Sequence, residues 1–101
     1  MKHVRSATYE IKQGSFQEIA DLAQDGMLRT FRDQPGFIRY GLADLGDNKC
    51  LSISLWETRE EADSATRVAA DWVRQNINER IELVTSQVGD LAFYEGVPAK
   101  V

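Results

Sequence analysis

The sequence predicts an α+β domain in which two helices cover one face of a four-stranded antiparallel sheet. Two observations support this class. Apolar residues alternate with a period of two in four segments and recur at spacings of three and four in two others. These segments follow the order strand, helix, strand, strand, helix, strand. A length of 101 residues suits one domain, covering residues 1–101.

The first strand is expected over residues 4–13, where Ala7, Tyr9 and Ile11 fall on one side. Gly14 ends it. Ser15 and Glu18 then have the spacing of a capping box, in which each side chain bonds the other residue's backbone amide, and an apolar helical face follows. The first helix is expected to stop before the Pro-Gly pair at residues 35–36.

A hairpin is expected next, with strands at residues 37–44 and 50–57 joined by turn residues 45–48. Thr58 and Glu61 form a second capping box and open the second helix, whose apolar face is rich in alanine. A last strand is predicted over residues 84–94, weakened at Gly89. The compact arrangement of these elements is ferredoxin-like, with both helices on one face.

The hairpin register sorts the two strands into unlike faces if Asp44 lies opposite Lys49. One face is then aliphatic with a tyrosine and comprises Ile38, Tyr40, Leu42, Leu51, Ile53 and Leu55. The other holds Phe37, Arg39, Gly41, Ser52, Ser54 and Trp56 and is expected to line a cavity under the helices. An uncovered apolar face usually marks an interface, so these six apolar residues predict a homodimer packed sheet to sheet.

Charge and composition exclude several classes of function. Twelve Lys and Arg against sixteen Asp and Glu give a net charge of -4, which disfavours nucleic acid and anionic membranes as partners. No apolar run approaches the roughly 20 residues of a membrane-spanning helix, and the N-terminus lacks a signal-peptide core. One cysteine, Cys50, fits a reducing compartment, so the cytoplasm is expected. One histidine and one cysteine cannot alone form a typical zinc site, and no metal is predicted.

Three segments together resemble the antibiotic biosynthesis monooxygenase (ABM) domain family. They are Gln34-Pro35-Gly36-Phe37, Ser52-Ile53-Ser54-Leu55-Trp56-Glu57-Thr58 followed by an acidic helix, and Gln13-Gly14-Ser15 before the first helix. The resemblance covers essentially the whole chain. It implies a dimeric α/β barrel made of two ferredoxin-like sheets, with a pocket between sheet and helices in each subunit.

The family resemblance implies more than one activity. Haem-degrading members use an Asn, a Trp and a His at positions that fall on Ala7, Trp56 and Thr66 in this sequence. Because Thr66 is not a normal axial ligand for iron, haem degradation is disfavoured. Other members oxidise phenols or quinols with O₂ and no cofactor. They pair the same Trp with a polar residue four positions earlier, which is Ser52 here.

The resemblance therefore implies a cofactor-independent monooxygenase acting on a small phenolic or quinol compound. Trp56 and Ser52 are the candidate catalytic residues, with Arg39 as the group that stabilises a substrate anion. The remaining pocket residues are expected to be Phe37, Gly41, Ser54, Ala7, Tyr9 and Thr66. No cofactor is expected, and the partner is a small aromatic ligand.

A second class of function stays open, namely a binding or structural dimer of the same fold with no reaction of its own. Each candidate also has a purely structural interpretation. Trp56 is also consistent with a core aromatic, Arg39 with a surface ion pair, and Ser52 with a small residue that lets a helix approach. The lack of a nearby base for either serine favours this second class.

Overall fold

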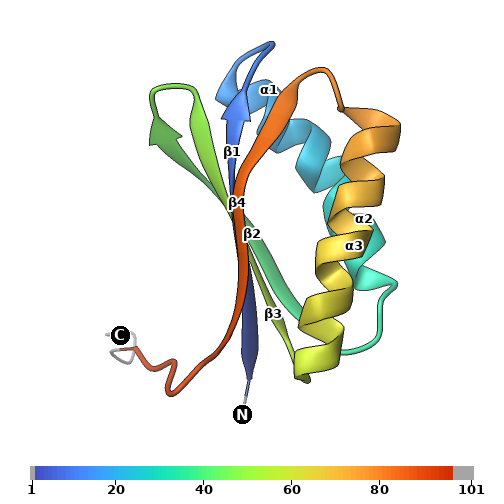
Figure 1. The fold of residues 1–101 in the computed structure, drawn as a ribbon, viewed down its shortest axis with the longest axis vertical. Coiled ribbons are helices and arrows are strands. Elements are labelled where there is room, and N and C mark those ends of the chain that lie inside the picture. Colours follow the sequence, from blue (N-terminus) through green and yellow to red (C-terminus); the bar gives the residue numbers. More distant parts are fainter. Residues whose placement is uncertain (1, 97–101) are drawn as a thin grey trace, which may run out of the picture.

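The computed structural model describes residues 2–96, which form a four-stranded antiparallel sheet with helices on one face (Figure 1). The strands are β1 (His3–Ile11), β2 (Phe37–Gly46), β3 (Lys49–Trp56) and β4 (Ile81–Asp90). Their order across the sheet is β2-β3-β1-β4, and every neighbouring pair is antiparallel. The predicted α+β, ferredoxin-like class is confirmed.

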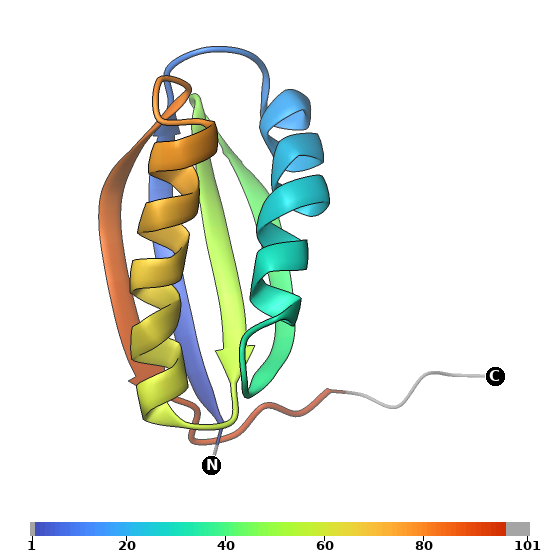
Figure 2. The ribbon, with the colours of Figure 1, turned by 90° about the vertical axis from the view of Figure 1, so that its right-hand side faces the viewer.

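The first helical region is one continuous run made of α1 (Phe16–Leu22), η1 (Ala23–Met27) and α2 (Leu28–Arg32). It and α3 (Arg59–Asn76) lie side by side on the same face of the sheet (Figure 2). The turn η1 has the wider hydrogen-bond spacing of a π-helix, and its Gly26 lies against Trp72 of α3. The first helical region and α3 therefore contact each other at a glycine, where the absence of a side chain makes room for the Trp72 ring.

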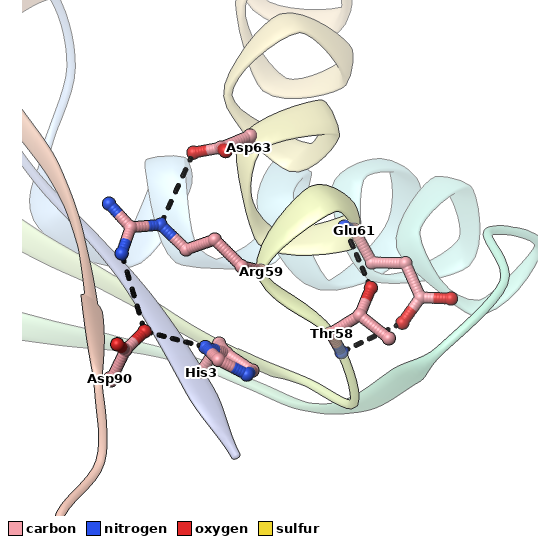
Figure 3. Close-up of polar contacts among 6 residues, drawn as sticks. All are labelled: His3, Thr58, Arg59, Glu61, Asp63 and Asp90. Carbon is pink, nitrogen blue, oxygen red and sulfur yellow. Dashed lines mark hydrogen bonds and ion pairs between the residues drawn. The ribbon is translucent and has the colours of Figure 1, made fainter. Parts of the chain in front are cut away.

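Both predicted capping boxes are present. The backbone N–H of Glu18 donates to Ser15 Oγ at 3.2 Å, and that of Glu61 donates to Thr58 Oγ1 at 3.1 Å. The backbone N–H of Thr58 donates in turn to Glu61 Oε1 at 3.0 Å (Figure 3). These bonds satisfy amides that the first turn of a helix leaves free, and so they fix where α1 and α3 begin.

The core lies between the sheet and the helices in two clusters. One gathers around Phe31 and Trp56, which are 0% and 1% exposed, and it includes the buried alanines of α3. The other lies toward the opposite end of the sheet and contains Tyr9, Ile19 and Ile77. Because alanine is small, α3 packs directly on β1, β3 and β4 along this face.

The hairpin between β2 and β3 turns more tightly than predicted. Asp47 and Asn48 have φ values of 51° and 60°, the left-handed pair of a two-residue type I′ turn. Gly46 therefore lies opposite Lys49, and an irregularity between Asp44 and Gly46 places Asp44 opposite Cys50. The predicted pairing of Asp44 with Lys49 is wrong by one residue.

This one-residue difference exchanges the faces of β2, because successive side chains of a strand alternate. Tyr40 lies opposite Ser54 and Leu42 opposite Ser52, so both face the helices. Arg39 lies opposite Leu55 and Gly41 opposite Ile53. A second irregularity after Phe37 restores the predicted pairing of Phe37 with Trp56.

The last strand begins earlier and ends earlier than predicted. It covers Ile81–Asp90 instead of residues 84–94, and Ile81 lies opposite Ile11 of β1. The polar residues before Ile81 form a short turn after α3. Glu82 then enters the strand because its backbone pairs with β1, which the side-chain pattern alone does not reveal.

The sheet face away from the helices, which we call the outer face, carries Val4, Leu51, Ile53 and Leu55. The segment 91–96 that follows β4 runs away from the helices in Figure 1. Phe93 and Tyr94 are 78% and 67% exposed. Within the described residues, no helix is both long and apolar enough to cross a membrane.

Candidate functional site

The inner face of the sheet, which packs against the helices, carries three buried polar side chains. Ser52 and Ser54 of β3 are 4% and 0% exposed, and Arg5 of β1 is 2% exposed. The prediction that Ser52 and Ser54 face the helices is confirmed. Arg5 lies directly opposite Ser54, so the polar residues form one group in the middle of the sheet.

Trp56 belongs to an aromatic cluster at the end of this group. Its ring packs edge-on against Phe31 and Phe37, with centroid separations of 5.3 Å and 5.5 Å. Its Nε1–H donates to Ser54 Oγ at 2.9 Å. The indole is 1% exposed and its polar atom is already bonded, so Trp56 and Ser54 stabilise the core in this state.

Tyr40 and Ser52 each place a hydroxyl group on the inner face. Burial raises the pKa of Tyr40 to about 12, although a hydrogen bond with Ser52 partly opposes this shift. The phenol is therefore neutral at physiological pH and serves as a hydrogen-bonding group. Burial likewise raises the pKa of the nearby Cys50 thiol, which disfavours its nucleophilic thiolate form.

A small cavity lies at the centre of the layer between sheet and helices. Its volume is about 20 Å³, room for about one water molecule. The hydroxyl groups around it come from the sheet, which also contributes the apolar Leu42 and Ile81, and the helix side is apolar. The lining side chains include Tyr9, Tyr40, Cys50, Ser52, Met27 and Trp72.

A larger pocket opens beside this cavity, between α3 and strands β1 and β4. Its volume is about 440 Å³, which is within the range of small-molecule sites. Arg5 and Tyr9 form its buried wall, Val73 and Ile81 add apolar surface, and Thr66 contributes a hydroxyl. Tyr9, Val73 and Ile81 also line the central cavity, so they separate the two spaces. We call this larger space the α3–β4 pocket.

Arg5 is the distinctive group of the α3–β4 pocket. Its Nη2 donates to the Tyr9 hydroxyl at 3.4 Å, and its buried Nε has no hydrogen-bond partner among residues 2–96. Tyr9 accepts this bond and keeps its own O–H available for another acceptor. The pocket thus offers hydrogen-bond donors and a positive charge at its buried wall.

The structure brings some of the predicted site residues together and separates others. Tyr9 and Thr66 line the α3–β4 pocket, and Ala7 is buried in the adjoining core. Phe37 lies in the aromatic cluster. Gly41 lines a separate pocket of about 190 Å³ between the first helical region and β2.

Arg39 is exposed, and its strand position places it on the outer face. It therefore lies across the sheet from the buried serines that it was predicted to join. Tyr40 and Leu42 were predicted on the dimer face but line the central cavity instead. In both cases the physical reason is the tighter turn at Asp47 and Asn48. Leu51, Ile53 and Leu55 lie on the outer face, and Ile38 stands at the irregularity in β2.

Sequence reasoning missed Arg5, although a signal for it exists. Residue 5 has the same parity as Ala7, Tyr9 and Ile11, which share the inner face of β1. The alternation therefore places an arginine among core residues. A charged residue is normally exposed, so the residue type gives no hint of burial although the pattern does.

Comparisons with known proteins add the family context. Residues 3–70 match the family model described as antibiotic biosynthesis monooxygenase. A search among curated proteins found no significant match.

Solved structures share the fold at low sequence identity. SnoaB from Streptomyces nogalater, described as a cofactor-independent oxygenase, is similar with a TM-score of 0.61 and 20% identity, covering 97% of this chain and 98% of its own. HapK from Hahella chejuensis has a TM-score of 0.70 and 14% identity, covering 99% and 100%. MupZ from Pseudomonas fluorescens has a TM-score of 0.70 and 11% identity, covering 86% and 69%.

Proposed function

Because the chain belongs to the antibiotic biosynthesis monooxygenase family, we propose that it oxidises a small phenolic or quinol compound with O₂ and no bound cofactor. The observation that carries this proposal is the α3–β4 pocket, about 440 Å³ in volume, which opens against the polar inner face of the sheet. The fold shared with a cofactor-independent oxygenase supports it.

The reaction is chemically complete with two reactants. A phenol with a free ring position and one O₂ give a quinone and one water. One oxygen atom of O₂ becomes the second quinone oxygen, and the other leaves as water with two hydrogens from the phenol. All four electrons come from the phenol, which is a better electron donor as its anion. The site must therefore favour the deprotonated substrate.

In this proposal, the residues of the inner face have distinct roles. Ser52 and Tyr40 provide neutral hydroxyl groups beside the central cavity, and Thr66 provides one in the α3–β4 pocket. Trp56 is a positioning residue, because its bond to Ser54 and its aromatic contacts fix this part of the sheet. Arg39 is not included, since it lies on the outer face.

Oxygen uptake tests this function directly. The protein is incubated with a panel of phenols and hydroquinones, while O₂ consumption and product spectra are followed. Turnover that falls at least fivefold in Ser52→Ala and Thr66→Val, but not in the exposed control Arg29→Gln, supports the proposal. Normal turnover in both Ser52→Ala, at the central cavity, and Thr66→Val, in the α3–β4 pocket, contradicts the assignment of the site.

A non-catalytic binding dimer is the second candidate function. The central cavity of about 20 Å³ favours it, because the space next to Ser52 and Tyr40 is too small for an aromatic ring. Ligand binding without any O₂ consumption over the whole panel would support this candidate. Turnover of any phenol would exclude it.

We propose in addition that the working unit is a homodimer that buries the outer face. Val4, Leu51, Ile53 and Leu55 give this face a central apolar strip. Leu55 is already buried, so a partner's sheet would remove mainly Val4, Leu51 and Ile53 from water. Cys50 is a free, buried thiol, which is consistent with the reducing cytoplasm as the location.

A further inference from the structure

Arg5 presents a buried positive charge without a matching negative one. It is the one charged side chain that is fully buried among the described residues, at 2% exposure. The ion pairs found within residues 2–96 do not include it. A buried charge is strongly unfavourable unless an opposite charge or several hydrogen bonds compensate it. The bond to Tyr9, at 3.4 Å, is too long to compensate it well.

The carboxylate that lines the α3–β4 pocket is already paired. Glu82 lies 3.1 Å from Lys12, and Arg74, also on the wall, lies 2.6 Å from Asp71. These charges are exposed and neutralise one another at the surface. Among residues 2–96, Arg5, at the buried wall, is therefore the charge of this pocket that lacks an opposite charge nearby.

The rest of the pocket wall suits an apolar body. Val73, Ile81 and Leu83 line it, and Leu83 is 49% exposed. A ligand that combines one oxyanion with a hydrocarbon ring would satisfy both parts of the wall. An inorganic anion would leave the apolar part exposed to water.

We infer that the α3–β4 pocket binds a small organic monoanion whose carboxylate or phenolate oxygen accepts hydrogen bonds from the Arg5 guanidinium and the Tyr9 hydroxyl. Its apolar body packs against Val73 and Ile81. Arginine suits this task because its planar guanidinium stays charged and directs several N–H groups at one ligand. The inference rests on the proposed function only in using the same pocket, since binding requires no turnover.

The first test compares an anion with a neutral molecule of the same shape. Benzoate and benzyl alcohol are titrated into the protein by calorimetry at neutral pH. Benzoate is expected to bind at least tenfold more tightly, because a hydrogen bond to a charged group is worth more than one between neutral groups. Equal affinity for the two, or no benzoate binding, overturns the inference and leaves water as the partner of Arg5.

The second test assigns the affinity to Arg5. Arg5→Gln is expected to weaken benzoate binding at least tenfold, and Arg5→Lys to recover part of it, since lysine keeps the charge but loses the planar donor geometry. Arg29→Gln removes an exposed arginine on α2 and serves as the matched control. Unchanged affinity in Arg5→Gln overturns the site. Near-ultraviolet circular dichroism checks that the variants keep the native packing.

The third test distinguishes the two sources of the oxyanion. The anion of 4-nitrophenol is coloured, so its absorbance reports its ionisation directly. If the pocket takes phenolates, binding to the wild type lowers the pH at which 4-nitrophenol ionises, and Arg5→Gln abolishes this shift. If benzoate binds through Arg5 and 4-nitrophenol binds without a shift, the site is supported for carboxylates.

Failure of this inference and failure of the proposed function are distinguishable. Benzoate binding that depends on Arg5, with no O₂ uptake over the phenol panel, supports the anion site and contradicts the oxidation. O₂ uptake that is unaffected by Arg5→Gln, with no benzoate binding, contradicts the anion site alone.

Discussion

The Nδ1 atom of His3 lies 2.7 Å from Oδ1 of Asp90, so the first residue of β1 is bonded to the last residue of β4 (Figure 3). Arg59 reaches the same carboxylate oxygen at 3.3 Å from the start of α3. Three elements thus meet at one acidic group. The hydrogen bond from His3, followed by the charges of His3 and Arg59, lowers the pKa of Asp90 below its ordinary 3.8.

This contact predicts a pH-dependent part of the stability. A carboxyl group whose pKa is lower in the folded state stabilises the fold above its unfolded pKa, and the contribution is lost as pH falls through the folded value. Asp90→Asn is therefore expected to unfold at lower urea than the wild type at pH 6, with the difference shrinking below pH 3.8. The effect is small because the group is exposed. A difference that stays constant down to pH 2 would contradict this explanation.

The bond between Ser54 and Trp56 predicts a coupled effect on stability. Ser54→Ala leaves the buried Nε1–H of Trp56 without its acceptor, which is expected to cost about 1–3 kcal/mol. In the Trp56→Phe background the same serine change should cost less, because no donor remains. Urea unfolding of the two single variants and the double variant measures this coupling. Ser86→Ala on β4 is the exposed control, and additive effects at 54 and 56 would contradict the prediction.

Much of the fold could be predicted because local signals were redundant. The two capping boxes fix the starts of α1 and α3, and the alternation in β3 correctly assigned Ser52 and Ser54 to the helix side. The alanines of α3 predicted its buried face, which the structure confirms for Ala62 and Ala69. In each case the spacing of the side chains agreed with the geometry of the helix or strand that the backbone forms.

The site was harder to predict because it depends on backbone irregularities. The φ angles of Asp47 and Asn48 define a two-residue turn, and they decide whether Arg39 or Tyr40 faces the helices. Asp and Asn can adopt positive φ angles but are also common in other turns, so the sequence is equally compatible with a longer turn. For Arg5 the alternation in β1 does indicate the inner face, but arginine is a residue type that is normally exposed.

The contact between Gly26 and Trp72 predicts a position where alanine is not tolerated. A Cβ atom at Gly26 would stand 2.5 Å from Cζ2 of Trp72, closer than packed carbon atoms approach. Gly26→Ala is expected to lower the free energy of unfolding by about 1–3 kcal/mol, despite the better helix propensity of alanine. Gly41 has no atom within 4 Å of the equivalent position, so Gly41→Ala is the control. Equal stability of the two variants in urea unfolding would show that α3 shifts freely away from η1.

The outer face predicts a change in oligomeric state. If two chains pack sheet to sheet, the wild type sediments at twice its 11.4 kDa mass at micromolar concentration. Ile53→Asp is expected to sediment as a monomer, because a charge on this face would be buried without a partner. Leu22 on α1 has nearly the same exposure as Ile53, 37% against 38%, so Leu22→Asp controls for adding a charge at an exposed apolar position. A wild-type monomer refutes the dimer. Dissociation by Leu22→Asp but not by Ile53→Asp would move the interface from the outer face to the helices.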